Sequence, residues 1–193
     1  MTRVRLVAYD EGWPSEFQRL GTAIRDALGA RVLRIDHVGS TSVPGLASKN
    51  VIDIQATVAS LELESLSGRL ARLGYERVAP YARDHLPPGG NSDEADWRKA
   101  FFLLASPERR VHLHVRVAGA ANQRYALLFR DYLRAHPAAV AAYASLKTKL
   151  SELDPPLEPD DYTDVKDPAC DLIIVAAEDW AERTGWRPAP SDA

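Results

Sequence analysis

Apolar side chains recur every three to four residues in five stretches of the chain, which is the period of an amphipathic helix. The first such stripe consists of Phe17, Leu20, Ile24 and Leu28. Pro14 suits the first turn of that helix and Gly29 suits its end. The pattern predicts helices over residues 14–28, 63–73, 122–135, 137–150 and 161–183. Pro168 lies inside the last of these, where we expect a bend or a restart.

Runs of β-branched and aromatic residues predict the strands. They occupy residues 3–9 (a short strand or an extended arm), 32–35, 51–58 and 75–82. Two further runs, 97–104 and 111–117, flank a turn at Ser106-Pro107 and predict an antiparallel hairpin. In the second run, alternation places His112, His114 and Arg116 on one face and the aliphatic residues on the other.

The strands fall in the first two thirds of the chain and the remaining helices follow them. We therefore expect one α+β domain over residues 1–193, with an α/β part at about 1–118 and a helical part at about 119–184. The C-terminal helices should pack on a mixed sheet that is flanked by helices. Residues 83–96 are rich in turn formers and charge, and predict a mobile surface loop or a lid over a site. Residues 185–193 are expected to be frayed.

Composition narrows the possible functions. A chain of 193 residues, 46% hydrophobic and 26% charged, is typical of a globular protein. The net charge of -3 without a basic run gives no support to nucleic-acid binding. Apolar runs such as 172–177 are far shorter than the roughly 20 residues that span a bilayer, so no membrane partner is expected and we predict a cytoplasmic protein. Cys170 is the only cysteine, which excludes an internal disulfide, and its apolar surroundings predict a core thiol.

The most unusual chemistry lies in one turn and in the strand that follows it. Gly39, Ser40, Thr41 and Ser42 offer backbone N–H groups and hydroxyls, the kind of concavity that receives phosphate. Asp53 then stands within an apolar strand, where an unpaired carboxylate is costly. It is predicted to hold a divalent cation, Mg²⁺ or Mn²⁺. The alternative is a buried structural aspartate that caps the turn.

The two histidines of the second hairpin strand are candidates for the same site. His112 and His114 are two residues apart and lie beside Arg116 on the face opposite the core. Imidazole suits Mn²⁺ or Zn²⁺ better than Mg²⁺, and it titrates near neutral pH, as a general base requires. We predict that both histidines serve the site as metal or substrate ligands. The alternative is that they are ordinary surface or core residues.

Basic side chains, most of them from the helical part, form the third group. Arg130 and Arg134 share one helical face, as do Tyr143 and Lys147 on the next helix. The candidate substrate-binding cations are Lys49, Arg98, Arg130, Lys147 and Lys166. Such residues could form a cationic wall opposite Asp53 that binds a triphosphate. The alternative is a set of solvated faces with surface ion pairs.

Several of these motifs resemble those of the GrpB family (UPF0157), part of the nucleotidyltransferase-fold superfamily. The run Gly-Ser-Thr-Ser-Val-Pro-Gly-Leu stands intact at Gly39–Leu46, followed by Lys49 and Ile-Asp-Ile around Asp53. The Asp-x-x-Trp-Pro opening, the His-Leu-His-Val run and the Phe-Arg-Asp-Tyr-Leu-Arg run extend the resemblance. It implies that the Gly-Ser pair grips nucleotide phosphates, that Asp53 holds metal and that His114 ligates metal or acts as a base. It also implies that His112 contacts substrate.

The sequence departs from the superfamily at one position, because Gln55 stands where the second metal-binding carboxylate is expected. Two functions therefore follow from the sequence. The first is a metal-dependent nucleotidyltransferase that binds a nucleoside triphosphate, or a related phosphorylated small molecule, and transfers a nucleotidyl group to an unidentified acceptor. The second is a non-catalytic module that binds a nucleotide or coenzyme, as in fusions of such domains to dephospho-CoA kinase. The sequence does not define an oligomeric state.

Overall fold

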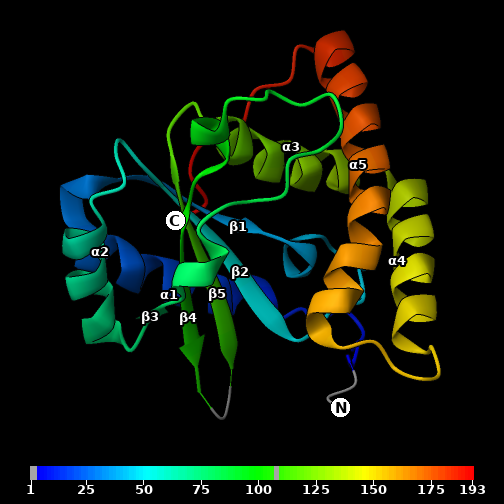
Figure 1. The fold of residues 1–193 in the computed structure, drawn as a ribbon, viewed down its shortest axis with the longest axis horizontal. Coiled ribbons are helices and arrows are strands. Elements are labelled where there is room, and N and C mark those ends of the chain that lie inside the picture. Colours follow the sequence, from blue (N-terminus) through cyan, green and yellow to red (C-terminus); the bar gives the residue numbers. More distant parts are fainter. Residues whose placement is uncertain (1–3, 107–108) are drawn as a thin grey trace.

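The computed structural model describes residues 4–106 and 109–193, and its centre is a five-stranded mixed sheet (Figure 1). The strands are β1 (Val32–Val38), β2 (Val51–Val58), β3 (Glu76–Arg77), β4 (Ala100–Ala105) and β5 (Arg110–Val117). They lie in the order β1-β2-β5-β4-β3. β2 and β5 are parallel, and the other neighbours are antiparallel. This arrangement confirms the predicted mixed sheet and the predicted hairpin.

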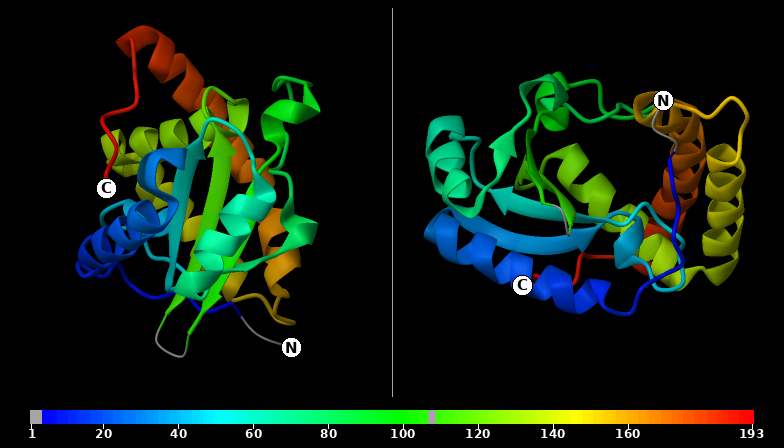
Figure 2. Two further views of the ribbon diagram at one scale, coloured as in Figure 1. Left: turned by 90° about the vertical axis from the view of Figure 1, so that its left-hand side faces the viewer. Right: turned by 90° about the horizontal axis from the view of Figure 1, so that it is seen from below.

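Helices cover both faces of the sheet (Figure 2). They are α1 (Trp13–Leu28), α2 (Leu63–Leu70), α3 (Ala121–Ala135), α4 (Pro137–Ser151) and α5 (Pro159–Thr184). α1 and α2 lie against one face, α3 crosses the other, and α4 and α5 stand together beside the sheet (Figure 1). The predicted α+β class is therefore confirmed. α5 continues through Pro168 without the expected interruption.

The main core lies between the sheet and the first two helices. The stripe on α1 packs with inward residues of β2 and β5, among them Ile52, Ile54, Val111 and Leu113. Because side chains alternate along a strand, the residues between these point to the opposite face. The parallel register places Asp53 opposite His112 and Gln55 opposite His114 on that face. The polar face of β2 and β5 is thus turned toward the helical part of the chain.

The strand predicted over 75–82 is mostly wrong. The strand covers Glu76–Arg77, Val78 N adds one hydrogen bond to Phe101 O of β4, and a short 3-10 turn at Ala79–Tyr81 follows. Pro80 lies in that turn, and proline cannot donate the backbone hydrogen bond that a continuing ladder needs.

The prediction of a frayed end at 185–193 is also wrong. Ser191 and Asp192 lie along the outer edge of β1, where the Ser191 hydroxyl accepts a hydrogen bond from Ile35 N at 2.8 Å. The backbone N–H of Asp192 donates to Ile35 O at 3.0 Å. These contacts join residues more than 150 positions apart, so no local pattern could indicate them.

Two expectations concern segments at the edge of the described residues. The predicted arm at 3–9 makes one bridge, between Val7 and Ser48, within its described part. The predicted turn at Ser106-Pro107 lies partly outside the described residues. Among the helices of residues 4–106 and 109–193, none combines the length and apolar character needed to cross a bilayer.

Candidate functional site

The turn after β1 brings the backbone of Gly39 against the side chain of Asp53. Gly39 has φ +69° and ψ -173°, a combination that side-chain-bearing residues avoid. A Cβ at this position would lie 2.8 Å from Asp53 Cγ, closer than carbon atoms pack. The turn Ser40–Ser42 follows directly. Glycine at position 39 therefore allows the hydroxyl-bearing turn and the carboxylate to share one corner of the sheet.

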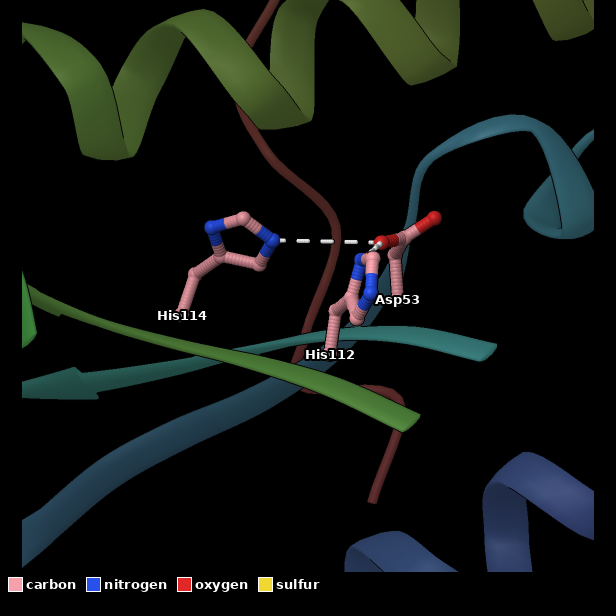
Figure 3. A group of neighbouring side chains, drawn as sticks. All are labelled: Asp53, His112 and His114. Carbon is pink, nitrogen blue, oxygen red and sulfur yellow. Dashed lines mark hydrogen bonds and ion pairs between the residues drawn. The ribbon is translucent and has the colours of Figure 1, made fainter. Parts of the chain in front are cut away.

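Asp53 and the two histidines form one cluster (Figure 3). Asp53 Oδ1 lies 3.1 Å from His112 Nδ1 and 3.8 Å from His114 Nε2. Burial opposes ionisation of the carboxyl, but hydrogen bonds from His112 and His114 outweigh it, so the pKa of Asp53 lies well below its ordinary value. The side chains of all three are only partly buried, so the carboxylate remains open to a ligand.

Two cations determine which nitrogen of the His114 ring carries its proton. Lys99 Nζ lies 3.3 Å, and Arg116 Nη2 3.4 Å, from His114 Nδ1. Both groups are donors, so we infer that Nδ1 accepts and that the ring proton is on Nε2, facing Asp53. Burial, with Lys99 and Arg116, lowers the pKa of His114 to about 3. In the free protein His114 is thus a neutral ring whose Nε2–H faces the carboxylate at 3.8 Å.

The donor set fits a divalent cation in type and spacing. One carboxylate and two imidazoles offer ligand atoms that lie within 4.8 Å of one another. His112 Nε2 is buried and has no hydrogen-bond partner among the described residues. His114 fits less well than the other two, because a ligating imidazole normally donates its second N–H to an acceptor. Here that second nitrogen faces Lys99 and Arg116 instead.

Asp84 is a site residue that the sequence did not reveal. It is the second residue of the expected loop or lid, and its carboxylate binds Arg116 at 2.8 Å, Lys99 at 2.6 Å and Asn122 at 3.0 Å. Burial opposes its charge, but Arg116 and Lys99 hold the pKa of Asp84 well below its ordinary value. The start of the 83–96 loop is therefore fixed to the floor of the site.

A cavity of about 370 Å³ joins the Asp53 cluster to helices α4 and α5. Three of the five lysines of the chain line it: Lys49, Lys147 and Lys166. Lys147 Nζ donates to Ser40 Oγ at 2.9 Å and to Ala47 O at 2.6 Å. Burial, together with Lys166 and Lys49, lowers the pKa of Lys147 to about 7. Mutually repelling cations in one partly enclosed space indicate a place for an anion.

The cavity gathers most of the residues that the sequence singled out. Those that line it are Gly39, Ser40, Lys49, Asp53, His112, His114, Lys147 and Lys166. Four others lie elsewhere: Thr41, Ser42, Arg98 and Arg130. Lys99, the neighbour of Arg98, lies 3.3 Å from His114 Nδ1. The roles of the eight cavity-lining residues in binding or catalysis remain predictions.

Three of the residues outside the cavity are bonded elsewhere and Arg98 points to solvent, so their predicted substrate contacts are corrected here. Thr41 is fully buried and its hydroxyl pairs with His37 Nε2 at 3.0 Å. The Ser42 hydroxyl donates to Gly39 O at 2.6 Å. The side chain of Arg98 is exposed. Arg130 is 1% exposed and is bound by carboxylates in the interior, so it cannot form part of a cationic wall.

Gln55 has partners that turn its amide away from the metal-ligand group. Its Oε1 accepts from Arg116 Nη1 at 2.6 Å, and its Nε2 donates to Gln123 O at 3.2 Å. The side chain is fully buried. The position expected for a second carboxylate is thus part of a hydrogen-bonded network around Arg116.

A Lys147→Met variant is expected to be more stable than the native protein at about pH 6, by about 1 kcal/mol or more, because a single pKa unit corresponds to about 1.4 kcal/mol. The folded-state pKa of about 7 lies below the ordinary 10.5, so between these values the unfolded chain holds a proton that the folded chain has lost. Native stability therefore rises with pH through this window. The gain in the variant should be largest below pH 7 and should shrink as the pH rises.

Urea unfolding across this pH range measures the effect, and Lys149→Met is the matched control. Lys149 lies on the same helix but is exposed, so its loss should leave stability within about 0.5 kcal/mol. A Lys147→Met protein that is less stable than native below pH 7 would show that the hydrogen bonds to Ser40 and Ala47 outweigh the buried charge.

The fold and the cavity together define an α+β protein with a mixed five-stranded sheet, in which a glycine turn faces a carboxylate–imidazole cluster. The family model described as GrpB protein matches residues 3–175. A UPF0157 protein of Streptomyces coelicolor is 40% identical over 175 residues, which cover 89% of this chain and 81% of that protein. The chain therefore belongs to the GrpB family (UPF0157).

Two further comparisons place the chain within that family. The crystal structure of the conserved protein GrpB from Enterococcus faecalis superposes with a TM-score of 0.73 and 28% identity, covering 90% of this chain and 96% of that one. A dephospho-CoA kinase of Mycolicibacterium paratuberculosis is 40% identical over 198 residues, covering 96% of this chain. The match covers 48% of the kinase, so the chain spans about half the length of this relative.

Proposed function

We propose that this protein binds a nucleoside triphosphate together with a divalent cation in the 370 Å³ cavity and transfers a nucleotidyl group to an acceptor. One observation carries the proposal. The Asp53–His112–His114 cluster and the three lysines Lys49, Lys147 and Lys166 line the same cavity. A metal-binding carboxylate opposite a cationic wall is the arrangement that phosphoryl chemistry needs.

The lysine side of the cavity suits the phosphate chain. Lys147 and the Ser40 hydroxyl already touch, so a phosphate oxygen can be bound by both with little movement. Lys49 and Lys166 lie in the same space and repel Lys147 until an anion neutralises them. A triphosphate would supply several negative charges there, which is more than a neutral or singly charged ligand offers.

The aromatic side of the cavity suits a nucleobase. Tyr125 and Phe129 stack on each other, with ring centroids 6.1 Å apart and planes inclined by 10°. Trp97 also lines the cavity and packs edge-on against Tyr125 at 6.2 Å. Stacking on such rings is worth about 1–3 kcal/mol per base and is tolerant of base identity.

In the proposed reaction an acceptor oxygen attacks the α-phosphorus. A new P–O bond forms, the bond from the α-phosphorus to the bridging oxygen of the β-phosphate breaks, and pyrophosphate leaves. A cation held by Asp53 and His112 would polarise the phosphate oxygens. His114 keeps the Asp53 carboxylate oriented, and the acceptor's proton passes to solvent water rather than to His114, because both ring nitrogens already face partners. Lys147 and Lys166 stabilise the charge of the departing pyrophosphate.

The second candidate is a non-catalytic module that binds a nucleotide or coenzyme. The pairing of Gln55 with Arg116 favours it, because this position contributes no second carboxylate. The match to half of a dephospho-CoA kinase also favours a role beside another enzyme.

Calorimetry with inorganic triphosphate, ATP, CTP, GTP and UTP, each with and without Mn²⁺, tests both candidates. We expect binding that Mn²⁺ strengthens, with the Mn²⁺-dependent part lost in Asp53→Asn. Lys147→Met should weaken binding by roughly tenfold with or without Mn²⁺, and Lys149→Met should leave it unchanged. Transfer is followed by label from α-phosphate-labelled triphosphate and by pyrophosphate release.

The outcomes separate the candidates. Tight binding that does not depend on Mn²⁺ or on Asp53, without release of pyrophosphate, would remove the enzyme and leave the module. Absence of binding to every triphosphate, in a protein that circular dichroism shows to be folded, would contradict both.

A further inference from the structure

The end of the cavity that adjoins α5 contains a thiol paired with a cation. Cys170 and Lys166 are four residues apart on α5 and therefore share one helical face. The Cys170 Sγ lies 3.2 Å from Lys166 Nζ and 3.5 Å from the Tyr143 hydroxyl. The cysteine, the lysine and the tyrosine all line the cavity. The thiol that the sequence assigned to the core is buried, but it also faces a polar, cationic space.

The neighbours of the Cys170 sulfur are cationic and polar. An ammonium group beside a thiol stabilises the thiolate, which is the nucleophilic form of cysteine. The Tyr143 hydroxyl can donate a hydrogen bond to the same sulfur. Lys147 and Lys49 line the same cavity and add positive charge. Structural thiols in apolar surroundings lack such partners.

A second observation indicates that this end of the cavity receives a ligand. The Tyr162 hydroxyl is buried and has no hydrogen-bond partner among the described residues, although the side chain is only 1% exposed. Tyr162 lines the cavity, and Lys49 Nζ lies 5.2 Å from its ring centroid. A buried hydroxyl without a partner costs about 1–3 kcal/mol, which a bound polar group would recover.

We propose that Cys170 is a lysine-activated thiol that opens into the cavity. Small neutral electrophiles, such as hydrogen peroxide, modify it covalently. A triphosphate bound in the cavity shields it from them. The shielding rests on the proposed function, whereas the reactivity does not. Cys170 lines the same cavity as Lys49, Lys147 and Lys166, where a triphosphate would lie in this proposal.

The modification steps follow ordinary thiolate chemistry. With iodoacetamide, the sulfur attacks the methylene carbon, an S–C bond forms and iodide leaves. With hydrogen peroxide, the sulfur attacks one oxygen, an S–O bond forms, the O–O bond breaks and hydroxide leaves. Sulfur is oxidised to a sulfenic acid and the peroxide is reduced. The product is uncharged, so Lys166 keeps Asp167, at 3.5 Å, as its anionic neighbour.

Alkylation of the ligand-free protein by iodoacetamide, followed by intact mass, tests the reactivity. Cys170 is the only cysteine, so the mass change reports this site alone. We expect Lys166→Met to react roughly tenfold more slowly than native, because the variant lacks the ammonium group that lies 3.2 Å from the attacking sulfur. Lys166→Arg should restore most of the rate, and Lys149→Met should not change it. The difference in thiolate absorbance between the native protein and Cys170→Ser gives an independent measure of the thiolate fraction.

Shielding is tested by repeating the reaction with saturating inorganic triphosphate, which should slow it roughly tenfold or more. Equal rates in native, Lys166→Met and Lys166→Arg proteins, all folded by circular dichroism, would overturn the activation by lysine. The alkylation rate is also measured in low concentrations of urea. If it changes in step with the rate of global unfolding, the thiol is sealed in the core. Fast, lysine-dependent labelling without protection by triphosphate would leave the thiol proposal standing and would contradict the proposed anion site.

Discussion

An Arg130→Met variant is expected to lose about 3–5 kcal/mol of folding free energy, a large part of the stability of a typical domain. Arg130 is 1% exposed, and its guanidinium binds Asp131 and Asp192, each at 2.7 Å. It also donates to His37 O at 3.0 Å and lies 4.0 Å from Asp36. Methionine fills a similar volume but leaves these acceptors without their cation, which is the costly way to break a buried ion pair.

Urea unfolding measures this loss, and Arg134→Met is the matched control. Arg134 lies one turn further along α3, has a side chain that is 37% exposed and donates to Ser42 O at 2.9 Å. Its removal should cost about 1 kcal/mol. If Arg130→Met kept its stability but lost binding of triphosphates, Arg130 would be a ligand residue, as the helical spacing in the sequence suggested.

A Gly39→Ala variant is expected to lose about 2–4 kcal/mol of stability and most of its metal-dependent binding. The backbone conformation at φ +69° costs a side-chain-bearing residue about 1–3 kcal/mol. The new Cβ would also lie 2.8 Å from Asp53 Cγ, so the carboxylate must move away from the two imidazoles. Both losses should appear together, in urea unfolding and in calorimetry with Mn²⁺ and ATP.

Gly45→Ala separates the two causes. Gly45 has φ +77°, so alanine is strained there too, but a Cβ at this position meets nothing within 4 Å. This control should lose about 1–2 kcal/mol of stability and keep its metal-dependent binding. Equal binding by Gly39→Ala and Gly45→Ala would show that the close approach of Gly39 to Asp53 does not matter for the site.

The sequence predicts much of the fold because its signals are local. Periodicity identifies the helices, and alternation identifies the face that carries His112 and His114. The structure places Asp53 beside both of them, because β2 and β5 are parallel neighbours in register. The strand predicted over 75–82 ends early because Pro80 cannot donate to a continuing ladder, although apolar residues flank it.

The positions of Asp84, Lys99 and Arg130 depend on partners that are distant in the sequence. Asp84 looked like one charge among many in a loop, and its binding to Arg116 spans 32 positions. Lys99 and Arg98 are adjacent, and only the course of the strand decides which of them faces His114. Arg130 shares the helical spacing of a surface cation, but Asp192, 62 positions away, fixes it in the interior. Residue type and spacing contain no information on such pairings.

The tail that lies along β1 also protects an otherwise open margin of the sheet. β1 is the terminal strand, and the backbone groups of Ile35 and His37 on its free side would be ready to pair with another chain. Ser191 and the Asp192 N–H satisfy Ile35, while the Asp192 carboxylate and Arg130 satisfy His37. The last residues of the chain thus guard against edge-to-edge aggregation, and their shortening would uncover a template for it.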